Sequence, residues 1–178
     1  MNAPKEMSTM DMYFSAKTQT LAQFKAVYDK RLLNETPQNG SPVIFCAMAN
    51  QAPQNRYDIV KFLMGEGAEL KGTNAENETL FHILFSRPKH IMEQTVDLTQ
   101  ILIEAGVDIN QLDAKHRVAI QHIISHPKFT DEDFAPLYDV IFQNCTLEVN
   151  VKNDWGYNPI ELARKLPYRA DLLRRMTE

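Results

Sequence analysis

The sequence has little cysteine, with two residues in 178, and it lacks any long uninterrupted apolar run. Two thiols cannot build a disulfide framework, and Cys46 and Cys145 stand among apolar neighbours, so we interpret each as a small core residue in a reducing compartment. No segment approaches the roughly 18 apolar residues of a membrane span, and the first residues lack the apolar stretch of a signal peptide. We therefore expect a soluble, cytoplasmic protein that contacts no membrane.

The chain also lacks an excess of positive charge. Its 23 acidic and 19 basic residues give a net charge of −4, which provides no whole-molecule field to attract a phosphate backbone. We therefore expect no nucleic acid among its partners. Basic residues gather near the end of the chain, where Glu161, Asp171 and Glu178 stand among them, and we interpret this segment as a solvated helix terminus. Its basic residues are Arg164, Lys165, Arg169, Arg174 and Arg175.

No motif of a known catalytic or cofactor chemistry is present. The sequence contains no G-x-S-x-G, phosphate loop, G-x-G-x-x-G or paired-cysteine metal signature, so we expect no enzyme, no catalytic residue and no cofactor. His122 and His126 have the i, i+4 spacing with which a helix presents two zinc ligands. Ile123 replaces the glutamate that a metalloprotease needs, and a third ligand is not visible, so we predict no metal site. A metal-dependent hydrolase built on this histidine pair is the alternative from another functional class.

What the sequence does contain is an internal repeat. Four segments open with a turn residue and run into a short amphipathic helix, and they begin at Asn39, Asn77, His116 and Gly156. A second helical block follows three of these openings, at 58–71, 97–110 and 136–150, and Gly67 and Gly106 stand where such a helix must stop. Equivalent end positions at Asn34, Lys71, Asn110 and Asn150 are 37, 39 and 40 residues apart. This near-constant step predicts a row of similar helix pairs.

The repeated segments resemble the ankyrin repeat, in which T-P-L-H-x-A and a helix are followed by L-L-x-x-G-A-D-x-N and another turn. The closest matches are TLFH from Thr79, IEAGVDIN from Ile103 and GYNPIELA from Gly156. The resemblance implies an all-α, ankyrin-type helix-turn-helix solenoid with short β-turn or hairpin connections, and it implies that His82 ties a turn to its neighbour. We expect a flexible N-terminus at 1–7 and one domain at 8–178. Its units are an N-terminal cap repeat at 8–35, internal repeats at 36–73, 74–112 and 113–152, and a C-terminal cap repeat at 153–178.

Two features depart from the ankyrin pattern. The unit at 113–152 has His116 in place of the turn glycine and Val118 in place of the threonine, so its turn and its first helix are harder to predict. The repeat is also longer than the usual length of about 33 residues, and the extra residues fall between the two helices of each unit, at 50–58, 86–97 and 125–136. We expect these insertions to form a ridge of loops along one edge. A binding ridge and helix ends lengthened by duplication both stay open as explanations.

The resemblance also implies a function, because ankyrin proteins usually contact a partner through the turn tips and the exposed side of the first helices. We therefore expect a monomeric protein-protein interaction module that binds another protein through its concave face and hairpin tips. The implied partner-binding residues are Gln38, Glu76, Glu78, Lys115, Arg117, Asp154, Trp155 and Tyr157. A cytoplasmic immunity protein that inhibits a cognate toxin is an alternative that rests on analogy. Trp155 is either an interface anchor or a cover for the open end of the core.

Overall fold

The computed structural model describes residues 3–37 and 40–178, and all regular structure in those ranges is helical. The chain is therefore all-α, as predicted. Helix α1 begins at Ala3, ahead of residue 8, where we expected the first unit to start. The α-helices are α1 Ala3–Thr18, α2 Leu21–Val27, α3 Val43–Met48, α4 Pro53–Glu66, α5 Leu80–Phe85, α6 Met92–Glu104, α7 Ile120–Ile124, α8 Asp131–Asn144, α9 Pro159–Arg164 and α10 Ala170–Thr177. Short 3-10 turns cover Lys30–Leu32 and Pro167–Arg169.

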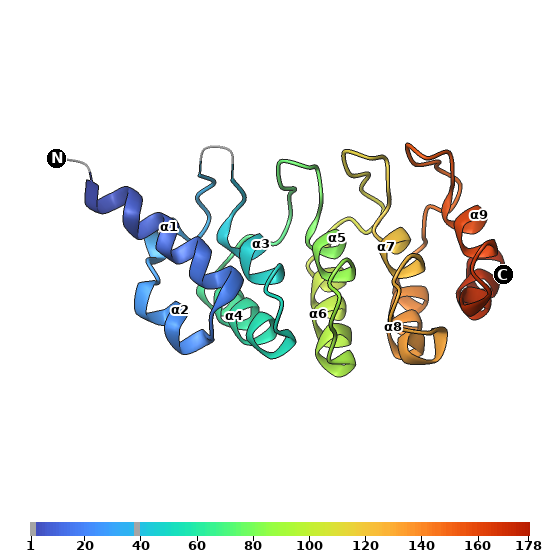
Figure 1. Cartoon of the computed structure of the whole chain (residues 1–178), viewed down its shortest axis with the longest axis horizontal. Coiled ribbons are helices and arrows are strands. Elements are labelled where there is room, and N and C mark those ends of the chain that lie inside the picture. The colour runs from blue at the N-terminus through green and yellow to red at the C-terminus, as the bar shows by residue number, and fades with distance from the viewer. Residues whose placement is uncertain (1–2, 38–39) are drawn as a thin grey trace.

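The helices form pairs, and the pairs stand side by side in a row (Figure 1). The short first helices contact one another in the order α3, α5, α7 and α9 along the row. The second helices do the same in another layer, in the order α4, α6, α8 and α10. Helices α1 and α2 open the row by packing against α3 and α4. Each pair thus gains its buried surface from its neighbours, and the long loops between pairs project to one side of the row.

Side-chain capping explains where four of the helices begin. A capping box, in which the side chain and backbone of the cap residue exchange hydrogen bonds with the third helical residue, is present at Thr20, Thr79, Thr130 and Asn158. Helix α7 spans only Ile120–Ile124, and its N-cap residue, Ala119, has no side chain that could cap it. This is the unit in which the sequence replaces the capping threonine with Val118, so a weaker signal accompanies a shorter helix.

Two glycines end the second helices as predicted. Gly67 has φ 96° and Gly106 has φ 72°, in the left-handed region that an L side chain adopts only with strain. After each glycine, the next backbone N–H turns back to a carbonyl oxygen of the last helical turn, from Ala68 to Leu63 and from Val107 to Leu102. This arrangement satisfies carbonyls that the helix end leaves without partners.

The inter-helix insertions form shorter loops than we predicted. Helices α4, α6 and α8 begin at Pro53, Met92 and Asp131, so at least half of each of 50–58, 86–97 and 125–136 is helical. We expected the second block of the fourth unit to open at Pro136, but Pro136 lies inside α8. The capping box at Thr130 and the three acidic residues of the first turn, which favour a helix N-terminus, move the start earlier.

Guanidinium groups connect the loops that remain between the two helices of each pair. Nη2 of Arg56 donates to the carbonyl oxygen of Lys89 at 2.6 Å, and Nη1 of Arg87 donates to the carbonyl oxygen of Ala49 at 3.2 Å. Both bonds join one pair to the next. Burial and the neighbouring Arg87 lower the pKa of Arg56 to about 10, which leaves it charged at neutral pH. Two buried or half-buried positive charges therefore connect neighbouring pairs at these loops.

Arg169 is the corresponding residue at the end of the row, and our interpretation of it as a solvated residue was wrong. Its side chain is fully buried. Its guanidinium donates to the carbonyl oxygens of Ile124, His126 and Phe129. Nη1 of Arg169 also lies 3.5 Å from the carboxylate of Asp131. Loop carbonyls that would otherwise be buried without a partner hold this charge inside, because an unpaired buried carbonyl costs free energy.

One apolar core runs through the row. Leu172 and Met176 of α10 are buried at its C-terminal end, where α10 packs on α8 and α9. Cys46 and Cys145 are free thiols at its edge, half-buried, and burial raises the pKa of both. Within the described ranges, no helix combines the length and apolar character needed to cross a bilayer.

Candidate binding face

Three loops between the helix pairs share one geometry, and we call residues 74–78, 113–117 and 153–157 the tip loops. Each opens with an amide or carboxylate, from Asn74, Asp113 or Asn153. Its Oδ1 accepts the backbone N–H groups of the residues two and four positions later. The first residue of each tip loop also donates its backbone N–H to the carbonyl oxygen of the fifth. Asx residues in turns favour this arrangement, which fixes the direction of every side chain on the loop.

The fourth residue of each tip loop has a left-handed backbone. Asn77, His116 and Gly156 have φ values of 58°, 55° and 81°. His116 therefore adopts the turn that glycine makes in the next unit. Its Nδ1 lies 2.6 Å from Oδ1 of Asp154, at the neighbouring tip.

Backbone hydrogen bonds join the three tip loops into a continuous edge. The N–H of Ala114 donates to the carbonyl oxygen of Glu76 at 2.8 Å, and the N–H of Asp154 donates to that of Lys115 at 3.1 Å. Because these bonds occupy polar backbone groups that a loop would otherwise expose, the tips are held in fixed relative positions.

The predicted partner-binding residues divide into three groups. Gln38 lies outside the described residues. Glu76, Lys115, Asp154 and Trp155 are exposed on the tips, whereas Glu78, Arg117 and Tyr157 are half-buried at their bases. The structure gathers only Arg117, Trp155 and Tyr157 around one pocket.

Trp155 projects from the third tip loop with 60% of its surface exposed. The guanidinium carbon of Arg117, on the preceding loop, lies 5.8 Å from the centroid of its ring. The exposure argues against Trp155 as a cover for the end of the core, a place that Leu172 and Met176 occupy. An exposed indole beside a guanidinium is instead typical of an interface anchor.

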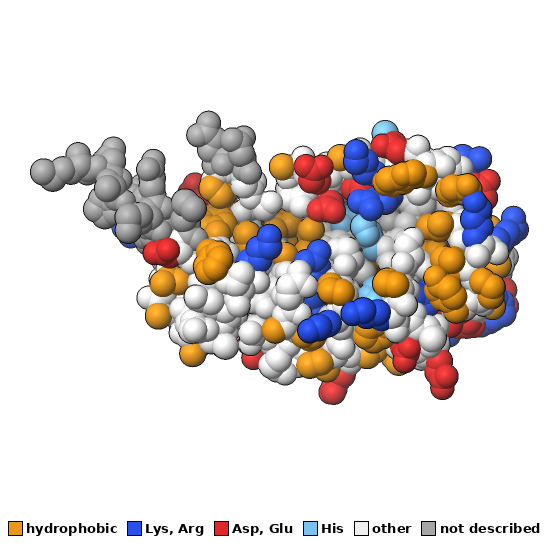
Figure 2. Space-filling view, viewed as in Figure 1, with side chains coloured by type: hydrophobic (Ala, Val, Ile, Leu, Met, Phe, Trp, Pro, Cys, Tyr) orange, Lys and Arg blue, Asp and Glu red, His pale blue; other side chains and the backbone are white. Residues whose placement is uncertain are grey.

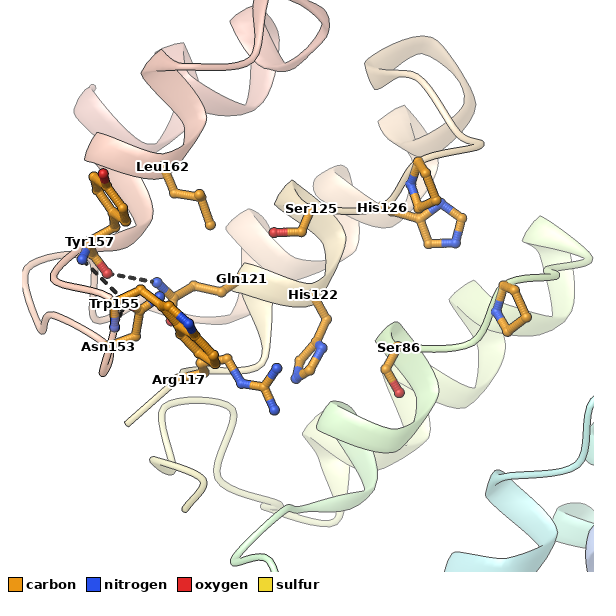
Figure 3. A pocket seen from close by; sticks show the side chains of 12 residues that line it. Ser86, Arg117, Gln121, His122, Ser125, His126, Asn153, Trp155, Tyr157 and Leu162 are labelled. Carbon is orange, nitrogen blue, oxygen red and sulfur yellow. Dashed lines mark hydrogen bonds between the residues drawn. The ribbon is translucent and has the colours of Figure 1, made fainter. Parts of the chain in front are cut away.

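A pocket of about 660 Å³ opens beside Trp155. Its lining comes from α7, from the loops that follow α5 and α7, from Arg117 of the second tip loop, and from the third tip loop with α9. Figure 3 shows Trp155, Arg117 and His122 close together on one side, with Leu162 and Ser125 across from them. Three successive pairs therefore build the pocket.

Arg117 brings a fixed positive charge to this pocket. Its Nε and Nη2 both lie 2.7 Å from Oδ2 of Asp113, whose carboxylate is buried, whereas 28% of the Arg117 side chain is exposed. Burial acts to raise the pKa of Asp113, but hydrogen bonds from Arg117 and from the backbone of Lys115 outweigh it and lower that pKa. The ion pair therefore persists at neutral pH and presents its cationic half to the pocket.

His82 and His122 lie behind Arg117, with ring centroids 5.9 Å apart. Nδ1 of His82 accepts the backbone N–H of Thr79, so its Nε2 carries the proton and donates to the carbonyl oxygen of Arg117 at 3.1 Å. This bond confirms the expected role of His82 in tying a turn to its neighbour. Burial, and then the charge of Arg117, lower the pKa of His122 to about 3. His122 is therefore neutral at physiological pH.

Two polar atoms of α7 are buried without a hydrogen-bond partner among the described residues. They are Nε2 of His122 and Oε1 of Gln121. Nε2 of Gln121 donates to the carbonyl oxygen of Tyr157 at 3.1 Å and so fixes its side chain against the third tip loop. At the pocket floor, the side chain of Gln121 is thus held in place, while one polar atom each of Gln121 and His122 has no hydrogen-bond partner among the residues described.

His122 and His126, the two histidines at i, i+4 spacing, contact different partners. His126 follows the end of α7, where its ring packs 5.5 Å from that of His90. Its Nδ1 accepts the N–H of Lys128, and its Nε2 donates to the carbonyl oxygen of Arg87. Because both ring nitrogens of His126 are engaged, this pair does not offer two free ligands to one ion.

A different group comes closer to a metal-ligand set in the described part of the chain. Potential ligand atoms of Glu78, Asp113 and His122 lie within 4.8 Å of one another. Both oxygens of Asp113 already accept hydrogen bonds, and Oε2 of Glu78 accepts one from Asn74. The adjacent guanidinium of Arg117 repels a second cation, so we assign these carboxylates to the neutralisation and ordering of the tip loops.

Sequence reasoning missed the residues that shape the tips and the pocket floor. A signal for the tips was present, since Asn74, Asp113 and Asn153 recur at steps of 39 and 40 residues with an Asx residue each time. Gln121 carried no comparable signal, and His122 was noticed only for its spacing from His126, because the role of both depends on contacts with other units.

The comparisons with known proteins add a fold and no function. No family model matches the sequence, and no curated protein matches it. Among solved structures, a functionally unknown protein from Leptotrichia buccalis C-1013-b is similar, with a TM-score of 0.82 and 24% sequence identity over 96% of this chain and 93% of that chain. At this identity the likeness shows the fold alone.

Proposed function

We propose that this chain is an ankyrin-type repeat protein whose function is to bind another protein through its tip loops and the adjoining first helices. Trp155 is the observation that carries the proposal. It is a large aromatic side chain, 60% exposed on an ordered loop, beside Arg117 and a pocket of about 660 Å³. Aromatic and arginine side chains contribute most of the free energy at many interfaces.

Regularity of the units supports the ankyrin part of the proposal. The short first helices and longer second helices alternate, and the three tip loops repeat the same hydrogen bonds. His82 links the capping of α5 to the next loop, as the resemblance implied. Such a scaffold holds exposed side chains in place before a partner arrives, which reduces the entropy lost on binding.

Parallel affinity capture tests the proposal. Wild-type protein, Trp155→Ala and Phe14→Ala serve as baits in one cell lysate, and quantitative mass spectrometry compares what each retains. Phe14 is a matched control, because it is an aromatic residue, 63% exposed, on α1 at the opposite end of the row. We expect a protein that wild type and Phe14→Ala retain and that Trp155→Ala loses by about tenfold or more.

Thermal unfolding of the three baits completes the test. We expect Trp155→Ala to melt within about 2 °C of wild type, because surface substitutions change stability little. A bait that enriches no protein over blank resin would count against the proposal. So would a Trp155→Ala variant that keeps every partner while its melting temperature falls, since Trp155 would then have a structural role.

A further inference from the structure

The pocket beside Trp155 has an uneven distribution of charge. Its lining, as far as the structure describes it, includes the guanidinium of Arg117 and no carboxylate. The counter-charge, Asp113, is buried behind Arg117 with 1% of its side chain exposed. Within the described residues, Nη1 of Arg117 has no hydrogen-bond partner. A negatively charged group in the pocket would therefore meet an available donor, while the carboxylates of Asp113 and Glu78 lie outside the lining, near His122.

A second positive charge stands beside the pocket, although the tip loops around it also carry the carboxylates of Glu76, Glu78 and Asp154. Nζ of Lys165 lies 3.6 Å from the ring centroid of Tyr157, which lines the pocket. Figure 2 shows several Lys and Arg side chains along the middle of this face, with Asp and Glu side chains beside those in its upper part. The described lining of the pocket, with Arg117 and no carboxylate, is therefore a cationic spot on a face of mixed charge.

Apolar groups surround the cationic group. The ring of Trp155, the side chain of Leu162 and the two loop prolines Pro88 and Pro127 all line the pocket. These groups exclude water from whatever lies against them, and an ion pair or charged hydrogen bond is stronger where water is excluded. The combination suits a short peptide segment that places a carboxylate next to an apolar side chain.

We propose that this pocket receives an aspartate or glutamate side chain of the partner protein, with its carboxylate on Arg117 and an adjacent apolar residue against Trp155. The inference rests on the proposed function and adds the chemistry that the partner must present. The pocket spans three helix pairs, and the exposed Trp155 is among its lining residues, so a partner's loop or extended segment can contact both. His122, neutral and partly accessible, does not compete for the carboxylate.

A charge-neutral double variant isolates this recognition. Asp113→Asn with Arg117→Gln removes both halves of the ion pair, so the net charge of the protein does not change. The neighbouring tip loops have asparagine, Asn74 or Asn153, at the position of Asp113, so the loop can keep its Oδ1 hydrogen bonds. Arg117→Gln alone would leave a buried carboxylate unpaired and would destabilise the fold. Arg117→Lys serves as a second variant, because it keeps the charge.

Selection from a display library of random short peptides, at about 150 mM salt, tests the proposal. We expect peptides selected by the wild type to be enriched in Asp or Glu beside an apolar residue. A selected peptide, synthesised with Asp or Glu and again with Asn or Gln, then binds each protein in calorimetry. We expect the wild type to prefer the acidic form by about tenfold, Arg117→Lys to keep part of this preference, and the double variant to lose it.

Each result decides between the two proposals. Selected peptides without acidic enrichment, or an acidic preference that survives in the double variant, would overturn the carboxylate pocket. If peptides without acidic enrichment bound the wild type but not Trp155→Ala, the proposed protein-binding function would still stand. A library that yields no binder overturns the carboxylate pocket, whereas the proposed function is decided separately by the lysate capture and by the comparison of Trp155→Ala with wild type. Binding of small anions such as citrate with no peptide bound would indicate a metabolite site and would also overturn the pocket proposal.

Discussion

Nε2 of His82, in α5, donates a 3.1 Å hydrogen bond to the carbonyl oxygen of Arg117, the last residue of the next tip loop. The same imidazole accepts the backbone N–H of Thr79 at its Nδ1 and so completes the cap of its own helix. One fully buried ring thus sets both the start of a first helix and the backbone position from which Arg117 reaches the pocket. The site is positioned by the pair that precedes it.

His82→Ala should destabilise the protein strongly. It removes a helix cap and an inter-pair hydrogen bond, and it leaves a cavity at a fully buried position. Together these losses predict a decrease of about 3 kcal/mol in the free energy of unfolding. Urea unfolding monitored by circular dichroism measures it. Thr79→Ser, which keeps the capping hydroxyl, should cost less than about 1 kcal/mol, and a His82→Ala variant as stable as wild type would refute this role.

The left-handed backbone at His116 gives a second prediction. His116→Val and His116→Asn both remove the contact with Asp154, but only asparagine tolerates a φ of 55° readily, as Asn77 does at the equivalent position. We expect His116→Val to be less stable than His116→Asn by about 1–2 kcal/mol. Thermal unfolding of the two variants measures the difference. Equal stability would mean that the loop relaxes to another conformation.

The sequence was sufficient for the repeated architecture. Helical periodicity and near-constant spacing predicted the pairs, and Gly67 and Gly106 marked helix ends because few other residues adopt that backbone. The start of α8 could not be placed in the same way. Pro136 is a strong helix-start signal, yet Thr130 and the acidic first turn provide a competing start with a capping box. Two valid local signals conflicted, and the burial of Phe134 and Tyr138 favours the earlier one.

The pocket was beyond prediction from one sequence. Of its lining, the tip residues Arg117, Trp155 and Tyr157 were expected, but His122 and Leu162 come from helices in different pairs. Their proximity depends on how far each pair is displaced against the next, which periodicity does not specify. The burial of Arg169 has a similar origin, because its partners are backbone carbonyls 40 to 45 residues earlier in the chain.

Pro136 itself gives a third prediction. A proline inside a helix removes one backbone hydrogen bond and crowds the preceding turn. Pro136 is exposed, so Pro136→Ala should stabilise α8 by about 1–3 kcal/mol with little change in packing. Pro53→Ala is the matched control, because Pro53 stands at the first position of α4, where proline is well tolerated. Differential scanning calorimetry should show a higher melting temperature for the first variant only, and the reverse order would contradict the helical placement of Pro136.

Acid should destabilise this fold through its buried imidazoles. Burial, and then Arg56, lower the pKa of His90 to about 4, while burial, and then Arg117, lower that of His122 to about 3. In the unfolded chain both titrate near a pKa of about 6.5. Above that pH neither state is protonated, but as the pH falls below it the unfolded state binds protons that the folded state refuses. The free energy of unfolding should therefore fall between pH 6.5 and 5, by about 2 kcal/mol for each histidine.

Urea unfolding at fixed ionic strength, repeated from pH 7.5 to 5, measures this dependence. His122→Gln removes one of the two groups with the largest shifts and should lower the slope by about 1.4 kcal/mol per pH unit, which corresponds to one proton. His82 and His126, whose pKa values burial also lowers, add in the same direction and should keep a residual slope in that variant. A stability that stays flat or rises from pH 7 to 5 would mean that these rings are accessible to protons in the folded protein, and the dry environment inferred for the base of the pocket would then be wrong.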